Sequence, residues 1–217
     1  MAFDPLNLTD LGADQIVTEA TMLALYNNPI EIAQRGVGAP VVQVPKREYL
    51  VVPGPFSWTW PDGVTAARFI LIGPGGIQAG ATPPTNTTLV YGATTVTAGA
   101  GSSAPAGTQV AGGVATGGDL NLPGQNVRSG NPEGGHSPLG YGYGADFGRN
   151  ATGYGAGGKL VLIGTTYTGS GGAYAEKRLE KDPGIPAVTL QVGSAGAPIG
   201  GAPTVYSNTG GLIIIEY

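Results

Sequence analysis

Glycine is the residue that most constrains what this chain can fold into. Of its 40 glycines, 28 lie between Gly73 and Gly172, in a stretch framed on both sides by short apolar segments. Glycine loses the most conformational freedom on folding and has no side chain to bury. We therefore expect this stretch either to stay disordered or to fold because something outside it supplies the missing burial.

The rest of the composition argues against disorder. Disordered chains usually carry a high net charge, whereas only 11% of these 217 residues are charged and the formal net charge is −4. The chain has no cysteine, which excludes disulfides and cysteine-bound zinc, so association between subunits is the expected source of stability. A pI of about 4.8 without any basic block argues against a nucleic acid partner.

The two usual routes to a membrane are also not expected. The first residues, 1–5, lack the positive charge and apolar core of a secretory signal, so we expect a soluble protein without an export signal. The longest apolar runs, such as 212–215, are too short to insert into a bilayer.

Residues 1–45 differ from the rest of the chain and predict two short helices followed by a linker. Thr18 can cap the first helix, Pro29 can begin the second, and Gly36 or Gly38 can end it. The two helices have an apolar face but are too short for a core of their own, so we expect them to dock on another surface. The residues expected to make this attachment are Met22, Leu23, Tyr26, Ile30 and Ile32.

Residues 46–217 predict an all-β domain, a glycine-rich β-sandwich with long glycine-rich loops. The continuous apolar run 67–72 has strand length and predicts burial on both faces, and Pro61, Asp62 and Gly63 predict a tight turn before it, as in a hairpin. Further strands are expected at 49–52, 56–60, 87–90, 94–97, 159–163, 173–177, 188–192 and 212–216.

The segment 102–158 has no clear strand pattern and forms a loop-rich insert. It can be a mobile loop, a set of polyproline-II-like segments packed through their glycines, or loops ordered only against neighbouring subunits. Its low charge favours the last two alternatives over the first.

Three possible catalytic patterns in the insert are weak. The run Gly153 to Lys159 has the glycine spacing of a phosphate-binding loop, but Leu160 follows where Ser or Thr is needed, so a glycine-rich loop entering a strand is favoured. The only histidine, His136, has no nucleophile motif to serve and is interpreted as a surface loop residue or a polar ligand contact. The carboxylates Asp119, Glu133 and Asp146 could supply a glycosidase pair, but loop carboxylates are usually solvated or cap turns. No enzyme, cofactor or metal site is expected.

Aromatic residues interleaved with glycine are the better candidates for a binding site. Rings beside a flexible, polar backbone suit the apolar faces and hydroxyls of sugars. Filling space between glycine-rich backbones, within or between subunits, is an equally good interpretation. The candidate glycan contacts are Tyr141, Tyr143, Phe147 and Tyr154, together with His136.

Several segments together resemble the glycine-rich domains of bacteriophage tail fibre and virion surface proteins. Residues 58–65, WTWPDGVT, are similar to the opening of those domains, and the stretches 117–124, 171–177 and 210–217 are similar to their other recurring pieces. The start of the chain, from Leu11 to Asn28, also resembles the openings of phage fibre proteins. The resemblance covers most of residues 1–72 and 159–217, and in the insert mainly 119–124.

The resemblance implies a non-enzymatic virion fibre or spike protein on the head or tail of a phage particle. The N-terminal segment would bind other virion proteins, and the β domain would face outward as a homo-oligomer, a trimer first of all, and bind host surface polysaccharide. The alternative is a purely structural decoration or connector protein without a receptor role.

Overall fold

A computed structural model describes residues 46–76, 82–105, 107–128, 134–142, 151–162, 165–196, 204–206 and 209–217. All of them belong to one compact unit, Lys46–Tyr217. The two helices expected before residue 36, with the attachment residues Met22, Leu23, Tyr26, Ile30 and Ile32, lie outside the described residues. The described part contains antiparallel sheets and no helix, which confirms the all-β prediction.

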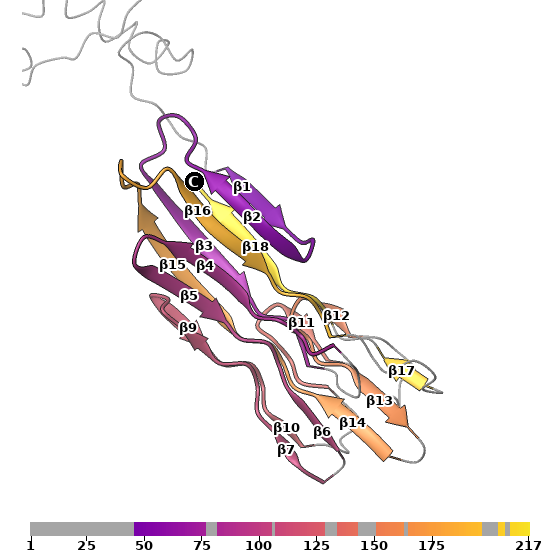
Figure 1. Cartoon of the computed structure of the whole chain (residues 1–217). Helices are drawn as coiled ribbons and strands as arrows, with labels where there is room; N and C mark the ends of the chain where they lie inside the picture. The colour runs from indigo at the N-terminus through magenta and orange to yellow at the C-terminus, as the bar shows by residue number, and fades with distance from the viewer. Residues whose placement is uncertain are drawn as a thin grey trace, which may run out of the picture. The chain divides into compact units, whose positions relative to one another are not determined.

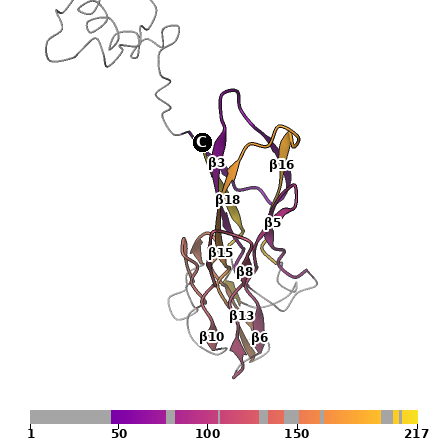
Figure 2. The ribbon, with the colours of Figure 1, turned by 90° about the vertical axis from the view of Figure 1, so that its left-hand side faces the viewer.

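Two five-stranded antiparallel sheets form one end of the unit (Figure 1). The first sheet has the strand order β1 (Arg47–Leu50), β18 (Leu212–Glu216), β3 (Ala66–Ile72), β15 (Tyr174–Glu180) and β9 (Leu120–Leu122). The second has the order β2 (Gly54–Thr59), β16 (Ala187–Val192), β4 (Thr87–Tyr91), β5 (Thr94–Ala98) and β8 (Ala115–Thr116). Seen after a quarter turn, the sheets lie as two layers facing each other (Figure 2).

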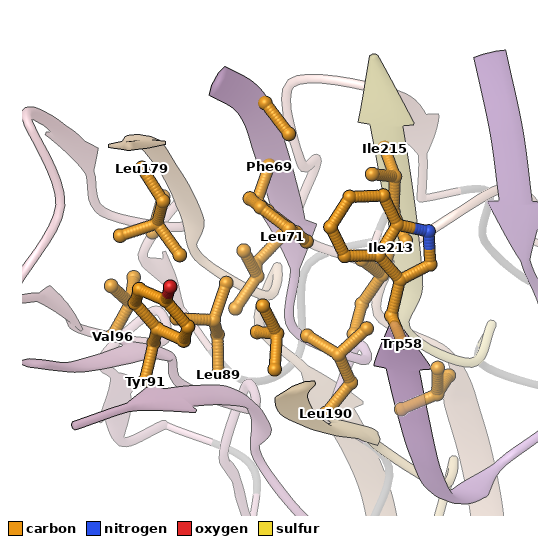
Figure 3. Close-up of a cluster of buried hydrophobic side chains, with 14 of the residues drawn as sticks. Trp58, Phe69, Leu71, Leu89, Tyr91, Val96, Leu179, Leu190, Ile213 and Ile215 are labelled. Atoms are coloured by element: carbon orange, nitrogen blue, oxygen red, sulfur yellow. The ribbon is translucent and has the colours of Figure 1, made fainter. Parts of the chain in front are cut away.

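A hydrophobic core fills the space between the two layers (Figure 3). Phe69 and Leu71 of β3 face Leu89 of β4 and Leu190 of β16, and all four are fully buried. Trp58 closes one side of this core, with its ring 5.1 to 5.4 Å from the rings of Trp60, Phe69 and Tyr217. Aromatic pairs at such distances add to the burial of apolar area, so this cluster is a main source of stability for the sandwich.

The strands with a clear apolar pattern lie where the sequence predicts them. In β3, Phe69, Ile70, Leu71 and Ile72 are all buried, as expected for a run with burial on both faces. The turn before β3 is also confirmed, because Gly63 has a φ of 77° and the Val64 N–H donates to the Pro61 carbonyl at 3.2 Å.

The strands on either side of that turn do not form the expected hairpin. β2 pairs with β16, whereas β3 pairs with β18 and β15, so the turn carries the chain from one sheet to the other. The reason is that Trp58 on β2 and Phe69 on β3 both point into the core from opposite sides, which bonding within a single sheet would not allow.

Next to the sandwich, the glycine-rich stretches run side by side as segments joined by backbone hydrogen bonds. We call these segments the glycine bundle. Its central segment is 169–173. In this segment, backbone N–H groups three residues apart donate to the same neighbouring segment, and three residues is the period of a polyproline II helix. The backbone N–H groups of this segment donate to carbonyl oxygens at N–O distances of 2.7 to 3.1 Å: Gly169 to Gly158, Ser170 to Ser102, Gly171 to Gln125, Gly172 to Gly155 and Ala173 to Gly99.

Six segments surround the central one: 73–76, 99–102, 111–114, 124–125, 134–136 and 155–158. Each is bonded to the central segment, and each is also bonded to the next, so that they close a ring around it. The bonds of this ring run from N–H to carbonyl oxygen: Gly101 to Pro74, Gly99 to Val114, Gly124 to Gly113, Gln125 to His136, Gly157 to Gly135 and Gly158 to Gly76. Of the three alternatives for the insert, its described residues therefore follow the second, segments packed through their glycines.

The close approach of the segments explains why the residue has to be glycine. A Cβ atom added to Gly169 would lie within 3.0 Å of the Gly76 carbonyl oxygen, and one added to Gly171 would lie as close to that of His136. Hydrogen bonds between neighbouring backbones take the place of side-chain burial. In the described segments, the backbone bonding partners of the glycine stretch come from the same chain.

The end of the unit beyond the bundle is built from short strands. β17 (Thr204–Tyr206), β13 (Lys159–Leu162), β14 (Thr165–Gly169) and β6 (Ser103–Pro105) form a four-stranded sheet, and β7 (Gln109–Val110) pairs with β10 (Val127–Arg128). A further pair, β11 (Gly140–Tyr141) and β12 (Thr152–Gly153), lies nearer to the sandwich (Figure 1). In the insert, no described strand exceeds three residues, which agrees with its lack of a strand pattern.

The unit has two distinct ends. Lys46 and Tyr217 exchange backbone hydrogen bonds of 2.6 and 3.0 Å at one end of the first sheet. The register of β3 against β18 places Ile72, and hence the entry to the glycine bundle, at the opposite end of that sheet. β6, β7 and β10 therefore lie far from the point where the chain enters at Lys46 (Figure 1). We call this region the far end.

Candidate functional site

An open hollow lies between β7 and β10 in the described part of the far end. It has a volume of about 370 Å³ and is lined by Gly107, Gln109, Asn126, Val127 and Arg128. This volume is at the lower end of the roughly 300–1,000 Å³ typical of small-molecule sites. The hollow is therefore large enough for a small ligand group.

The pairing of β7 with β10 determines which side chains line the hollow. Val110 pairs with Val127 and both are buried, so the alternation of strand side chains turns their neighbours outward. Those neighbours, Gln109 and Arg128, are cross-strand partners and both are exposed. An amide and a guanidinium thus lie side by side at the surface.

Asn126 completes a set of hydrogen-bond donors in the hollow. Its Oδ1 accepts a hydrogen bond of 2.7 Å from the N–H of Gly112 in the glycine bundle. This bond fixes the orientation of the amide, so the Asn126 NH₂ group is the part that can donate to a ligand. Together with the Arg128 guanidinium and the Gln109 amide, the hollow can donate several hydrogen bonds to one acceptor group.

Arg128 differs from the other described arginines in its ion pairing. Arg47, Arg68 and Arg178 each form an ion pair with a glutamate, whereas Arg128 has no carboxylate partner in the described part of the chain. All described carboxylate side chains lie in the sandwich strands or the turns beside them: Glu48, Asp62, Asp119, Glu176, Glu180, Asp182 and Glu216.

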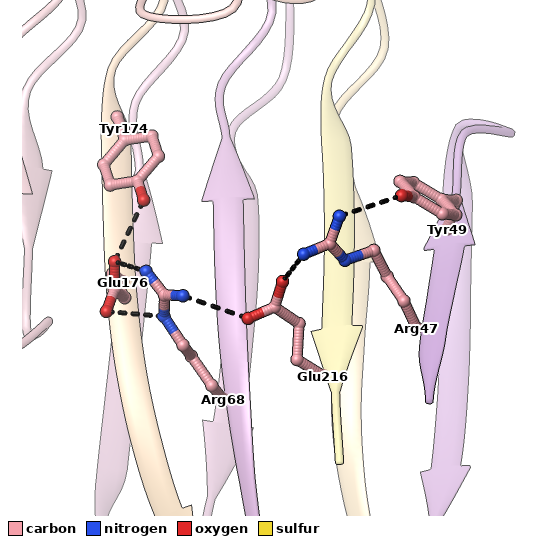
Figure 4. A network of polar contacts seen from close by, with 6 residues as sticks. All are labelled: Arg47, Tyr49, Arg68, Tyr174, Glu176 and Glu216. Atoms are coloured by element: carbon pink, nitrogen blue, oxygen red, sulfur yellow. Dashed lines mark hydrogen bonds and ion pairs between the residues drawn. The ribbon is translucent and has the colours of Figure 1, made fainter. Parts of the chain in front are cut away.

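The outer face of the first sheet carries another polar cluster (Figure 4). Arg68 binds both carboxylate oxygens of Glu176 at 2.7 Å and also Glu216 at 3.0 Å, and Arg47 pairs with Glu216 from the next strand. The Arg68 guanidinium holds the pKa of Glu176 below its ordinary value, with a smaller lowering by the hydroxyl of Tyr174. Because each charge in this cluster has an opposite partner, we interpret it as a structural ladder across four strands.

The candidate glycan contacts fall in different places. Tyr143 and Phe147 lie outside the described residues, and of Tyr141 only the backbone, in β11, is described. His136 belongs to the ring of the glycine bundle, where its Nδ1 accepts a hydrogen bond of 3.1 Å from the Gly142 N–H. His136 is half-buried. The described atoms therefore do not bring these candidates together into one site.

Tyr154 has a packing role in addition to any contact with a ligand. Its ring packs with Tyr174 against a small apolar cluster on the outer face of the first sheet, formed by Ile70, Ile72, Leu212 and Ile214. Its position fits the second of the two interpretations of these rings, in which they fill space beside glycine-rich backbone.

The weak catalytic patterns gain little from the structure. Asp119 is ion-paired with Lys177 and accepts a hydrogen bond of 2.9 Å from the Arg178 N–H, and these contacts lower the pKa of its carboxyl group. Glu133 and Asp146 lie outside the described residues. Gly155 to Gly158 belong to the glycine bundle and lead into β13, as expected for a glycine-rich loop entering a strand.

The described residues contain no group of three or more side chains that could hold a metal ion. They also contain no helix long and apolar enough to cross a membrane.

Compared with known protein families and with curated proteins, the chain matches no family model and no curated protein.

The hollow is the feature that sequence reasoning missed. Gln109, Asn126 and Arg128 form no motif, because their proximity depends on the pairing of two-residue strands that have no detectable pattern. The one available signal is the position of Arg128, a basic residue in a glycine-rich stretch with few charges.

Proposed function

We propose that this chain is a non-enzymatic fibre or spike protein of a phage or phage-like particle, and that its far end binds polysaccharide on the host surface. Residues 1–45 attach the protein to other virion proteins, and residues 46–217 are displayed outward as a glycine-rich β-sandwich with an extended glycine bundle. We also propose that the first 45 residues form the two short helices that make this attachment.

The observation that carries this proposal is the presence of two distinct ends in the unit 46–217. The chain enters beside its C-terminal residue at one end, and the hollow and the short strands lie at the other. The covalent connection to residues 1–45 is at Lys46, at the end of the unit opposite the hollow. The glycine bundle between the two ends is held by backbone hydrogen bonds in several directions, so it suits a stiff spacer.

The chemistry of the far end suits sugar. Amide groups such as those of Gln109 and Asn126 can both donate to and accept from sugar hydroxyls. Weak single sites are sufficient on a particle, because many copies bound to one surface raise the overall avidity by orders of magnitude. A homo-oligomer, with a trimer as the first expectation, multiplies the sites further.

Binding of the purified full chain to a panel of bacterial surface polysaccharides tests the proposal. We expect binding by the unaltered protein and at least a tenfold loss on replacing Tyr141, Tyr143 and Phe147 together with alanine, while the melting temperature stays unchanged. Tyr49→Ala is the matched control, because Tyr49 is an exposed ring on β1, in the sandwich. If the control weakens binding and the triple variant does not, Tyr141, Tyr143 and Phe147 are not the glycan contacts.

The attachment role has a separate test. Leu23→Asp combined with Ile32→Asp is expected to leave polysaccharide binding unchanged and to prevent incorporation of the protein into particles. If the purified chain binds no polysaccharide and particles carrying the triple variant adsorb normally, the alternative of a structural decoration or connector protein is favoured.

A further inference from the structure

We infer that the hollow between β7 and β10 binds the anionic group of an acidic polysaccharide, a carboxylate or a phosphate, and that Arg128 is the residue that selects it. This inference rests on the proposed function, since it names the class of sugar that the far end would take.

The hollow is lined by a set of hydrogen-bond donors. Arg128 offers a planar array of N–H groups, and Asn126 and Gln109 add amide donors on the same side. Guanidinium groups bind carboxylate and phosphate through paired hydrogen bonds, which are stronger than bonds between neutral groups. A hollow with these donors and no carboxylate in its described lining fits an anion better than a neutral sugar.

Arg128 takes no part in the ion pairs that support the sandwich. The other described arginines are used in ion pairs on or beside the sandwich, and Arg128 has no such partner among the described side chains. Val127 beside it is buried and holds β10 in place, so the backbone at Arg128 is anchored independently of its side chain.

Charge is distributed unevenly along the chain. Residues 1–45 contain five carboxylates and one arginine, so the formal charge of −4 belongs to this segment and residues 46–217 are neutral in sum. The displayed unit therefore does not repel an anionic polymer. A single arginine is not a basic stripe, which argues against a nucleic acid ligand.

The test measures binding of the full chain to three probes: trigalacturonate, which carries carboxylates, mannose 6-phosphate, and neutral maltotriose. We expect the hollow to bind at least one anionic probe at least tenfold more tightly than maltotriose. This preference should weaken as salt is raised, because the hollow is open to solvent. The anionic probe that binds more tightly identifies the group that the hollow prefers.

Three variants locate the effect. Arg128→Gln is expected to lower affinity for the anionic probe at least tenfold without changing the melting temperature, and Arg128→Lys to retain part of it because charge remains without the paired geometry. Arg178→Gln is the control, since Arg178 is an exposed arginine on β15 of the sandwich.

The outcomes separate this inference from the proposed function. If the chain binds neutral and anionic probes equally and Arg128→Gln has no effect, the inference is wrong while glycan binding stands. If the chain binds neither these probes nor any surface polysaccharide, the proposed function is wrong as well. If Arg178→Gln weakens binding as much as Arg128→Gln, general charge and not the hollow accounts for the preference.

Discussion

At the scale of single residues, Gly169 and Gly171 of the central segment 169–173 have the closest backbone neighbours among the described glycines. Their backbones approach those of neighbouring segments so closely that even one methyl group would overlap a carbonyl oxygen. Not every described glycine is constrained in this way. A Cβ added to Gly210, for example, would have its nearest neighbour at 3.9 Å, which is ordinary contact.

This contrast gives a matched pair of variants. Gly171→Ala is expected to lower the free energy of unfolding by at least about 3 kcal/mol, because the surrounding backbones must move apart. In a unit of this size that corresponds to roughly 6 °C or more in melting temperature. Gly210→Ala should change stability by less than about 1 kcal/mol, and it can be stabilising because alanine restricts the unfolded chain. Thermal unfolding followed by circular dichroism measures both. Equal effects of the two variants would contradict the close packing around segment 169–173.

The ladder on the first sheet predicts a dependence of stability on pH. The pKa of Glu176 is held below its ordinary value, first of all by Arg68, so the folded state binds this proton less readily than the unfolded state does. The resulting stabilisation is present above the unfolded pKa, near 4.5, and is lost as the pH falls below it. Because 45% of the Arg68 side chain is exposed, we expect at most about 1 kcal/mol.

Arg68→Met isolates this contribution. The difference in unfolding free energy between the unaltered protein and the variant should be largest above pH 5 and shrink toward pH 3, as measured by urea denaturation. A difference that stays constant across this range would show that the pair with Glu176 does not contribute through charge.

At the scale of the elements, the threefold repeat of bonding partners sets the register of the glycine bundle. Gly169 and Gly172 bond to one neighbouring segment, and Ser170 and Ala173 bond to another. Shifting the segment by one residue would direct each N–H toward the wrong neighbour and leave buried polar groups without partners.

Inserting one glycine after Gly171 therefore should lower the free energy of unfolding by at least about 3 kcal/mol, since each orphaned buried group costs about 1–3 kcal/mol. The same insertion between the exposed residues Val51 and Val52, in the connection from β1 to β2, is the control and should cost less than about 1 kcal/mol. Denaturant unfolding measures both. A mild effect of the first insertion would mean that the register of the bundle is not specific.

The elements also show how much could be predicted from the sequence. Strands such as β3 and β18 were predictable because their apolar runs are long enough to identify a buried strand. The end of β15 was missed because Arg178 and Glu180 face outward, and only Leu179 among the last residues is buried. The pairing of β2 with β16 could not be inferred, because it depends on contacts between residues more than a hundred positions apart.

The glycine bundle was predictable only as one of several alternatives. Glycine has no side chain, so its segments carry no periodicity from which neighbours could be inferred. The candidate site shows the same limit. The aromatic residues were visible in the sequence, but the hollow with Arg128 depends on the pairing of β7 with β10.

At the scale of the whole molecule, the central claim is that the glycine stretch becomes ordered by bonding to itself within one chain. This claim changes the meaning of the expected oligomer. A trimer stays a prediction for the particle, where it would multiply binding sites, and the bonds that we expect to order the bundle lie within each chain.

Amide hydrogen exchange in dilute solution, with the mass of the native species measured on the same sample, tests this claim most directly. The account predicts that the amides of segment 169–173 exchange at least about a thousandfold more slowly than in an unfolded chain, equivalent to about 4 kcal/mol, at a concentration where the protein is monomeric. Exchange at the rate of an unfolded chain, or protection that is present only in an oligomer, would contradict it.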